Sequence, residues 1–466
     1  MVHTHACKLT PKSVRSVLAL CSFAAMLGGC GGGGTGTTLT RPPTPTPTPT
    51  QTPAGLPQHV IIVVQENRSV DNLFAGFAGA DTQAYGYDSK GQRIPLKQVA
   101  LGAPYDPKHS HESFVTEFNN GAMNGFDANG CEGKPCPSDA AYEYVDPADI
   151  APYRLLAAQN ALADHVLQAN EGPSFAAHIY LIAGQSGSPG SRWYIAENVA
   201  GHQFDNCLAP PSHTVQQIDM TTPYPGVEGN PIFPCIDPPT VLDELDKAGI
   251  GWRYYTPALG WIWTSPLAIR HLYDSPSDRA RVVTPETSIF NDIRERKLQP
   301  VSYVIPRIRN SDHGGPDRGT GGPAWVASIV NAIGGSPYWA NTAIVVTWDD
   351  WGGWFDHYVP THPTNPLGGT PDPYEYGFRV PVIAAGSMAK TGYIDHTPRS
   401  SAAIVHFIED VYGLPSLGEL DAQTDDLFSM FAFGSPRKAF EKIPTGAVTI
   451  ESLRNLPPDS TPIDAE

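Results

Sequence analysis

The stretch that most restricts the fold is HVIIVV at residues 59–64, which is followed at once by Gln65, Glu66 and Asn67. A continuous β-branched run is typical of a strand that is buried on both faces. Such strands occur mainly in parallel sheets that helices cover on both sides. The sequence therefore predicts a parallel sheet and places an acid and an amide where one buried strand ends.

The rest of the chain alternates strands and helices. Further strands are expected at 252–255, 300–306, 342–350 and 379–386, and helices at 153–168, 174–184, 240–249, 324–336 and 401–413. This alternation predicts an α/β fold with a mostly parallel central sheet flanked by helices. Residues from about 75 to 150 and from about 186 to 236 are expected to form loop-rich insertions.

The first 30 residues have the pattern of an export signal. A basic start precedes the apolar run VLALCSFAAMLGG at 17–29, which is too short to span a bilayer permanently and ends at Cys30. Small residues before a cysteine are typical of a bacterial lipoprotein signal, in which the thiol is lipidated. The alternative is an ordinary secretory signal that is cleaved nearby. Both interpretations predict an exported protein, anchored in the periplasm or at the cell surface, or secreted.

Composition suggests four segments. Residues 1–30 form the signal, residues 31–56 a Gly/Thr/Pro-rich linker, residues 57–440 the folded domain and residues 441–466 a Pro-rich tail. A formal net charge of −17 argues against nucleic acid as a partner and against electrostatic binding to anionic lipid. Membrane contact is therefore expected only through a lipidated Cys30, and oligomeric state is not indicated.

Four cysteines follow the signal: Cys131, Cys136, Cys207 and Cys235. An even number in an exported chain predicts disulfides, and the local pairs are Cys131–Cys136 and Cys207–Cys235. A metal site is the alternative, but the spacing does not suit zinc.

Two pairs of polar residues follow two of the predicted strands. Glu66 and Asn67 follow the first, and Asp349 and Asp350 end the strand at 342–350. If both strands belong to one parallel sheet, these side chains lie on the same edge. Carboxylates that close together repel unless a cation neutralises them, so a divalent metal site is predicted. Each acid alone could instead cap a helix or lie in a solvated turn.

A serine and several histidines add to this pattern. Ser174 follows Gly-Pro and opens an apolar helix, whose N-terminus would favour an anion or the alkoxide of the serine. The alternative is that Ser174 only caps the helix. His109, His111, His313 and His357 lie in predicted loops, where they could donate hydrogen bonds, bind metal or protonate a leaving group, or be surface residues.

Four segments, in order, resemble the motif set of a known family. They are QENRSVDNLF, GPSFAAHIYLIAGQS, SDHGGP and TWDDWGGWFDHYVP. This set resembles that of the bacterial phosphoesterase family, which unites phosphatidylcholine-type phospholipases C with AcpA-type acid phosphatases. The resemblance covers roughly residues 57 to 415. It implies a fold similar to alkaline phosphatase and arylsulfatase.

The resemblance also implies a site. Glu66, Asn67, Asp349 and Asp350 match the family's ligands for one divalent cation, and Ser174 matches the nucleophile, which also touches the metal. The ion's identity is not indicated.

The histidines match family positions as well. His313 matches a histidine that contacts the transferring phosphoryl group. His109 matches the histidine that precedes the segment NNGAMNGF, although His111 could take that position instead. His313 and His109 are both expected among the catalytic residues. His357 lies in FDHYVP and is expected among the catalytic residues. A further mid-chain histidine pair of the acid phosphatases has no match near WRYYTP.

The expected function is therefore a metal-dependent phosphoesterase that works through a phosphoserine intermediate and is acid-phosphatase-like. A phospholipase C that cleaves phospholipid headgroup diesters is the first alternative. A non-catalytic exported binding lipoprotein is the second.

Overall fold

The computed structural model describes residues 55–133, 135–199, 205–315, 319–360 and 376–457. The predicted signal, Cys30 and nearly all of the predicted linker lie outside these residues. In the described part of the chain no helix is long and apolar enough to cross a membrane.

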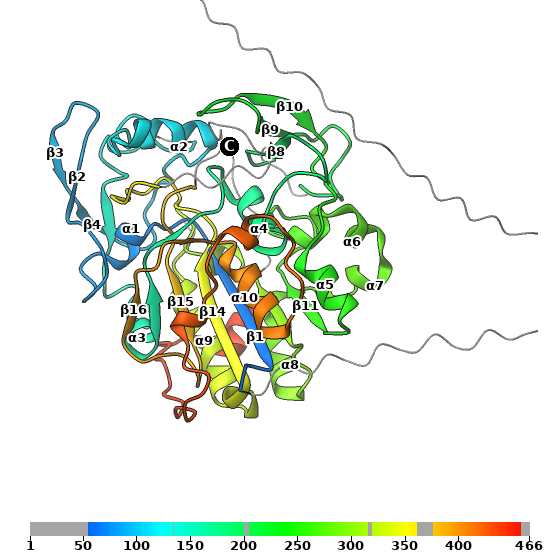
Figure 1. Ribbon diagram of the computed structural model, residues 1–466. Helices are drawn as coiled ribbons and strands as arrows, with labels where there is room; N and C mark the ends of the chain where they lie inside the picture. The colour runs from blue at the N-terminus through cyan, green and yellow to red at the C-terminus, as the bar shows by residue number, and fades with distance from the viewer. Residues whose placement is uncertain (1–54, 134, 200–204, 316–318, 361–375, 458–466) are drawn as a thin grey trace, which may run out of the picture. The chain divides into compact units, whose positions relative to one another are not determined.

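The centre of the described domain is an eight-stranded sheet in the order β12-β11-β13-β1-β14-β15-β6-β16 (Figure 1). Only β15 runs antiparallel to its neighbours, because both β14 and β6 oppose it. The prediction of a mostly parallel sheet is confirmed. The strands are β1 His59–Gln65, β6 Ala161–Ala163, β11 Trp252–Tyr255, β12 Val282–Val283, β13 Val301–Val304, β14 Thr342–Trp348, β15 Val382–Ala385 and β16 Tyr393–Asp395.

Strands β1 and β14 form the middle of this sheet. They pair in parallel along their whole length, and the register sets Gln65 opposite Trp348. Every residue of β14 and all but the first residue of β1 are buried, as the aliphatic runs predict. The two strands therefore end level with each other, and the residues that follow them lie on one edge.

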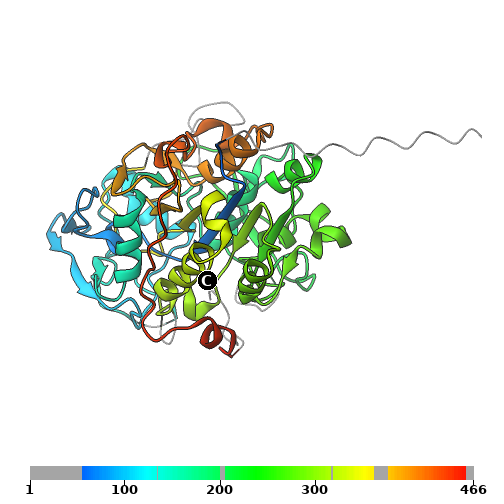
Figure 2. The ribbon, with the colours of Figure 1, turned by 90° about the horizontal axis from the view of Figure 1, so that it is seen from below.

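Helices cover both faces of the sheet (Figure 2). On one face, α3 and α8 both contact α9, and on the other α4, α5 and α10 contact one another. The expected helix ends are present, since Thr240 forms a capping box at α5 and Gly413 ends α10 with a φ of 64°. The helices are α3 Ala151–Gln159, α4 Ser174–Ala183, α5 Val241–Lys247, α8 Ile289–Glu295, α9 Gly322–Gly334 and α10 Ala403–Tyr412.

The single helix predicted over residues 153–168 is wrong in its second half. Helix α3 ends at Gln159, where the side chain of Asn160 donates a hydrogen bond to the Leu156 carbonyl (2.9 Å). The next residues form β6 and then β7 Val166–Leu167. β6 is buried between β15 and β16, so sheet pairing overrides the helical spacing of the sequence.

The two insertions carry small sheets of their own. The segment from about 75 to 150 contains β2 Tyr85–Tyr87, β3 Arg93–Pro95, β4 Lys97–Val99, β5 Glu143–Val145 and helix α2 His111–Phe118. The segment from about 186 to 236 forms a three-stranded sheet from β8 Trp193–Ile195, β9 Val215–Asp219 and β10 Glu228–Ile232.

Residues 441–457, which the sequence assigns to a tail, pack on the domain. They include helix α11 Ile450–Arg454, whose Leu453 is buried. The guanidinium of Arg307 donates hydrogen bonds to the carbonyls of Leu456 and Pro457 (both 3.0 Å). Only residues 458–466 of the predicted tail lie outside the described part.

Both predicted disulfides, Cys131–Cys136 and Cys207–Cys235, are present. They close loops within the two insertions, and neither involves a metal.

Candidate active site

The ends of β1 and β14 bring the four predicted metal ligands together. The Asp349 amide donates a hydrogen bond to the Gln65 carbonyl (2.9 Å), which extends the parallel ladder by one step. The main-chain amide of Asn67 then donates to Asp349 Oδ1 (3.0 Å). Glu66, Asn67, Asp349 and Asp350 are all fully or almost fully buried. The predicted common edge for these side chains is therefore what the structure shows.

The turn after β1 has a backbone conformation that suits its sequence. Asn67 has a φ of 61°, in the left-handed region where asparagine is one of the better tolerated residues. Gly352, with a φ of 62°, packs against this turn, and a Cβ there would lie 2.4 Å from the Asn67 carbonyl oxygen. The Gly352 amide donates to Asp350 Oδ1 (2.7 Å). The glycine lets the two turns meet and holds the Asp350 carboxylate in place.

Ser174 lies beside this cluster, as the first residue of α4. Its Oγ donates a hydrogen bond to Asp350 Oδ2 (3.2 Å), and the side chain is fully buried. The helix start is not capped by Ser174, because Pro173 occupies the cap position and Asn198 Oδ1 accepts from the Phe175 amide (2.8 Å). The alternative that Ser174 is only a cap is therefore wrong.

His178 is a site residue that the sequence analysis did not assign. It lies four residues after Ser174 on α4, so both side chains are on one face of the helix. Its Nε2 is 3.2 Å from Glu66 Oε1 and 3.6 Å from Asp349 Oδ2. The spacing Ser-x-x-x-His at a helix start was the signal that could have identified it.

His109 contacts the cluster through Asn67. Its Nδ1 lies 2.9 Å from the Pro107 carbonyl and must donate to it, which leaves Nε2 as an acceptor. The side-chain amide nitrogen of Asn67 donates to this Nε2 (2.9 Å). The nitrogen of the Asn67 side chain is thereby turned towards His109, while its Oδ1 is buried without a hydrogen-bond partner.

His313 stands next to His109, with the two ring centroids 6.1 Å apart. Its Nδ1 donates to the Gly314 carbonyl (2.9 Å) and is 3.5 Å from Asp106 Oδ2. The ring is fully buried, and the indole of Trp263 packs over it with centroids 6.3 Å apart. These contacts fix the ring beside the cluster.

His111, the alternative to His109, belongs to another group. Its Nε2 contacts Glu171 (2.9 Å) and its Nδ1 contacts Glu228 (2.5 Å). Burial lowers the pKa of His111, but these two glutamates outweigh it and raise the pKa to about 10. His111 is a charged bridge between the segment before Ser174 and strand β10.

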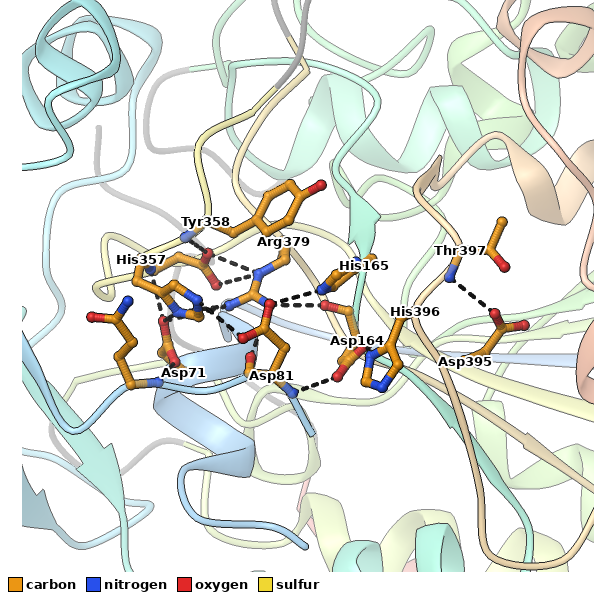
Figure 3. A network of polar contacts seen from close by, with 12 residues as sticks. Asp71, Asp81, Asp164, His165, His357, Tyr358, Arg379, Asp395, His396 and Thr397 are labelled. Carbon is orange, nitrogen blue, oxygen red and sulfur yellow. Dashed lines mark hydrogen bonds and ion pairs between the residues drawn. The ribbon is translucent and has the colours of Figure 1, made fainter. Parts of the chain in front are cut away.

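His357 does not join the cluster in the described structure. Its Nδ1 contacts Asp71 Oδ2 (2.6 Å), and its Nε2 is 3.3 Å from Asp81 Oδ1 (Figure 3). Burial lowers its pKa, but the hydrogen bond to Asp71 and that carboxylate's charge raise it above its usual value. Arg379 Nε donates to Asp356 Oδ1 (2.9 Å), so the Asp356–His357 pair of the motif supports the fold around Arg379.

A second layer of buried polar groups supports the edge. Arg68 donates two hydrogen bonds to the Asp312 carbonyl (3.0 and 2.7 Å), and Tyr153 and Trp348 donate to Asp312 Oδ2 (2.7 and 3.1 Å). Burial raises the pKa of Asp312 to about 7, against the opposing charge of Arg68. This network fixes the loop that carries His313.

The donor set fits a divalent cation. Three buried carboxylates converge, and Glu66, His178 and Asp349 each offer an atom within 4.8 Å of the others. Among the described residues, Asn67 Oδ1 and Asp349 Oδ2 are buried without a hydrogen-bond partner. Buried polar atoms without partners are costly, and a cation would satisfy both.

A sheet edge that gathers carboxylates and an amide beside a serine at a helix N-terminus is typical of an α/β enzyme that acts on anionic substrates. The model of the Phosphoesterase family matches residues 57–415, and the chain belongs to this family. It is a hydrolase that acts on phosphoric ester bonds, and the predicted family is confirmed.

Known relatives are similar at low identity. The chain is 25% identical to phospholipase C A of Mycobacterium tuberculosis, over 81% of this chain and 78% of the relative. It is 22% identical to the non-hemolytic phospholipase C of Pseudomonas aeruginosa, over 83% of this chain and 59% of the relative. A solved protein in the alkaline phosphatase superfamily from Vibrio parahaemolyticus is 11% identical, with a TM-score of 0.36, over 81% of this chain and 71% of that one.

Proposed function

We propose that this phosphoesterase uses Ser174 as its nucleophile and one divalent cation held by Glu66, Asn67, Asp349 and Asp350. The observation that supports this most is the hydrogen bond from Ser174 Oγ to Asp350 Oδ2 within a buried set of carboxylates. Ser174 does not cap α4, because Pro173 occupies the cap position. When bound, the cation would act as a Lewis acid that offsets the carboxylate charge and favours the ionised serine.

The chain's own groups provide the remaining parts of the reaction. Asp350 orients Ser174 Oγ, and the N-terminus of α4 favours negative charge on that oxygen. Attack of Oγ on phosphorus forms the Oγ–P bond of a phosphoserine as the ester P–O bond breaks, and the leaving oxygen takes up a proton and departs as the alcohol. Water then attacks the phosphoserine, which releases phosphate and restores the Ser174 hydroxyl. His313 is proposed to donate a hydrogen bond to a non-bridging oxygen, where charge must be stabilised.

His109 is proposed to act on the metal site through Asn67. Replacing His109 by alanine removes the acceptor that orients the side-chain amide of Asn67, so its oxygen, the proposed ligand atom, is no longer held in one position. We expect metal affinity to fall by about 10- to 100-fold, with turnover largely restored at saturating metal. Metal titration followed by activity assays separates the two effects.

The matched control for this variant is His59→Gln. His59 also has its Nδ1 on a main-chain carbonyl, that of Gln299 (3.0 Å), but at the opposite end of β1. The His59→Gln variant should bind metal with unchanged affinity. An His109→Ala protein whose turnover stays low at every metal concentration would show that His109 acts on the substrate instead.

The preferred ester is proposed to be a phosphomonoester, because the segment SFAAH that begins at Ser174 resembles the acid-phosphatase-like branch of the family. Phospholipase C activity is the second candidate, and the names of the two relatives favour it. Residues 55–466 would be assayed on p-nitrophenyl phosphate and on p-nitrophenyl phosphorylcholine, each with and without a chelator. We expect faster, chelator-sensitive turnover of the monoester.

Each other outcome has a distinct meaning. Faster turnover of the diester would assign a phospholipase C, and the insertions around α2 and β10 would border its headgroup. No turnover of either ester, with or without added metal, would favour the non-catalytic binding lipoprotein.

We further propose export of the protein as a lipoprotein through Cys30. The two disulfides support an oxidising compartment. The whole chain, expressed in a bacterium with radiolabelled palmitate, should incorporate label and remain with the membrane fraction, and Cys30→Ser should abolish both. Label-free protein that is secreted with a cleaved signal would contradict the anchor.

A further inference from the structure

A second cluster of metal-ligating side chains lies at the β6–β16 edge of the sheet. Strand β16 pairs with β6 in parallel, and the register sets Asp395 opposite Ala163. The next residue on each strand is therefore level with its neighbour, which brings His396 beside Asp164. His165 follows directly and projects into the same group (Figure 3).

The geometry of this group is compact. His396 Nδ1 is 2.8 Å from Asp164 Oδ1, and the rings of His165 and His396 have centroids 5.4 Å apart. One ligand atom each of Asp164, His165 and His396 lies within 4.8 Å of the other two. Asp81 adds a second carboxylate, since its Oδ2 is 2.9 Å from His165 Nε2.

Main-chain contacts hold the ligand-bearing segments together. The buried guanidinium of Arg379 donates from Nη1 to the carbonyls of Asp81 (2.9 Å) and Asp164 (3.1 Å). The Asp81 amide donates to Asp164 Oδ2 (2.6 Å). Arg379 Nε pairs with Asp356 Oδ1 (2.9 Å), and its Nη1 is 3.8 Å from Asp81 Oδ2. Such an outer layer orients the ligands.

We propose that Asp164, His165 and His396, with Asp81 as a fourth ligand, form a binding site for a transition-metal ion of the zinc class. Two imidazoles with carboxylates suit zinc, whereas calcium and magnesium prefer oxygen ligands alone. Zinc binds such atoms at about 2.0–2.1 Å, so ligand atoms about 3.4 Å apart surround it. The ligand atoms of Asp164, His165 and His396 already lie within 4.8 Å of one another.

Burial at the site changes from inside to outside, which gives an ion access. Asp164 is buried, His165 has 15% of its side chain exposed, and Asp81 and His396 have 43% and 50% exposed.

The proposed site is separate from the active site. Among the described residues, none of its four side chains contacts Glu66, Asn67, Ser174, Asp349 or Asp350. An ion there would join three segments: the loop after α1 Val70–Phe74, the β6–β7 connection and the end of β16. The proposal does not depend on the proposed reaction.

The test counts zinc ions on the whole chain. Metal-depleted protein is titrated with Zn²⁺ against a chromophoric chelator. We expect two equivalents for the wild type, one for the double variant His165→Gln/His396→Gln, and one for Asp350→Asn. The double variant should keep full turnover when its active site is loaded. Zinc-edge absorption of Asp350→Asn should show two imidazole ligands.

His271→Gln is the matched control. His271 lies between two carboxylates, Asp237 (2.6 Å) and Asp243 (2.9 Å), but has no second histidine, so this variant should still bind two equivalents. Equal zinc binding by the double variant and the wild type would overturn the proposal. If the double variant does not fold, anomalous scattering from zinc-soaked wild-type crystals decides, and no peak beside Asp164 would overturn it. Failure of the active-site proposal alone would leave the wild type and Asp350→Asn at one equivalent each and the double variant at none.

Discussion

Replacing Ser174 by alanine is expected to reduce turnover by about 10⁴-fold or more, because the group that attacks phosphorus is lost. Stability should change little. Ser174 Oγ makes one hydrogen bond, to Asp350, and it does not cap its helix. Metal content should fall only slightly if Oγ is one of five ligands. Initial rates on p-nitrophenyl phosphate, urea unfolding and metal analysis check the three parts.

Ser186→Ala is the matched control for this variant. Ser186 is equally buried and donates one hydrogen bond, to the Ile195 carbonyl (3.0 Å), but it does not contact the carboxylates. The Ser186→Ala variant should lose about 1 kcal/mol of its free energy of unfolding and keep its turnover. A Ser174→Ala protein that retains a near-normal rate would exclude Ser174 as the nucleophile.

Replacing Asp350 by asparagine is expected to lower metal affinity by more than about 100-fold, beyond the usual effect of a residue that only supports a ligand. The asparagine oxygen can still accept from the Gly352 amide, and its NH₂ group can donate to Ser174 Oγ, so the fold should persist. Without metal the variant should be more stable than the wild type, because one of several buried like charges is gone. With metal bound, the wild type should be more stable than the variant. Unfolding curves with and without the cation measure both effects.

Asp312→Asn separates the effect of a ligand from that of any buried carboxyl. Asp312 lies beside His313 and accepts from Tyr153 and Trp348, but it has no contact with the four proposed ligands. Its positive φ of 72° also suits asparagine. Relative to the wild type, the free energy of unfolding of Asp312→Asn should change by the same amount with and without metal. A stability change in Asp312→Asn that depends on metal would contradict the assignment of ligands. So would a stability change in Asp350→Asn that does not depend on metal.

The centre of the fold and the common edge of the proposed metal ligands could be predicted from the sequence for one physical reason. The runs 60–64 and 343–346 are aliphatic throughout, which is typical of central strands of a sheet covered on both sides. Polar residues directly after such strands must lie on its carboxyl edge. The positions of Glu66 and Asp349 therefore followed from pattern alone.

Other features depend on contacts between distant segments. The end of α3 at Gln159 is set by pairing of β6 with β15 and β16, which come more than 200 residues later. His357 was expected at the active site because it follows the two aspartates closely, but Asp71 and Asp81 hold it in the Arg379 network. The link from His109 to Asn67 joins two loops and leaves no periodic signal in the sequence.

The most direct test of the central claim is to trap the reaction intermediate. The protein, loaded with its cation, is mixed with p-nitrophenyl phosphate, quenched in acid within one turnover and digested for peptide mapping by mass spectrometry. The account predicts one phosphate per chain on Ser174, and none in Ser174→Ala. A burst of nitrophenol with no phosphorylated peptide, or phosphate on another residue, would contradict it.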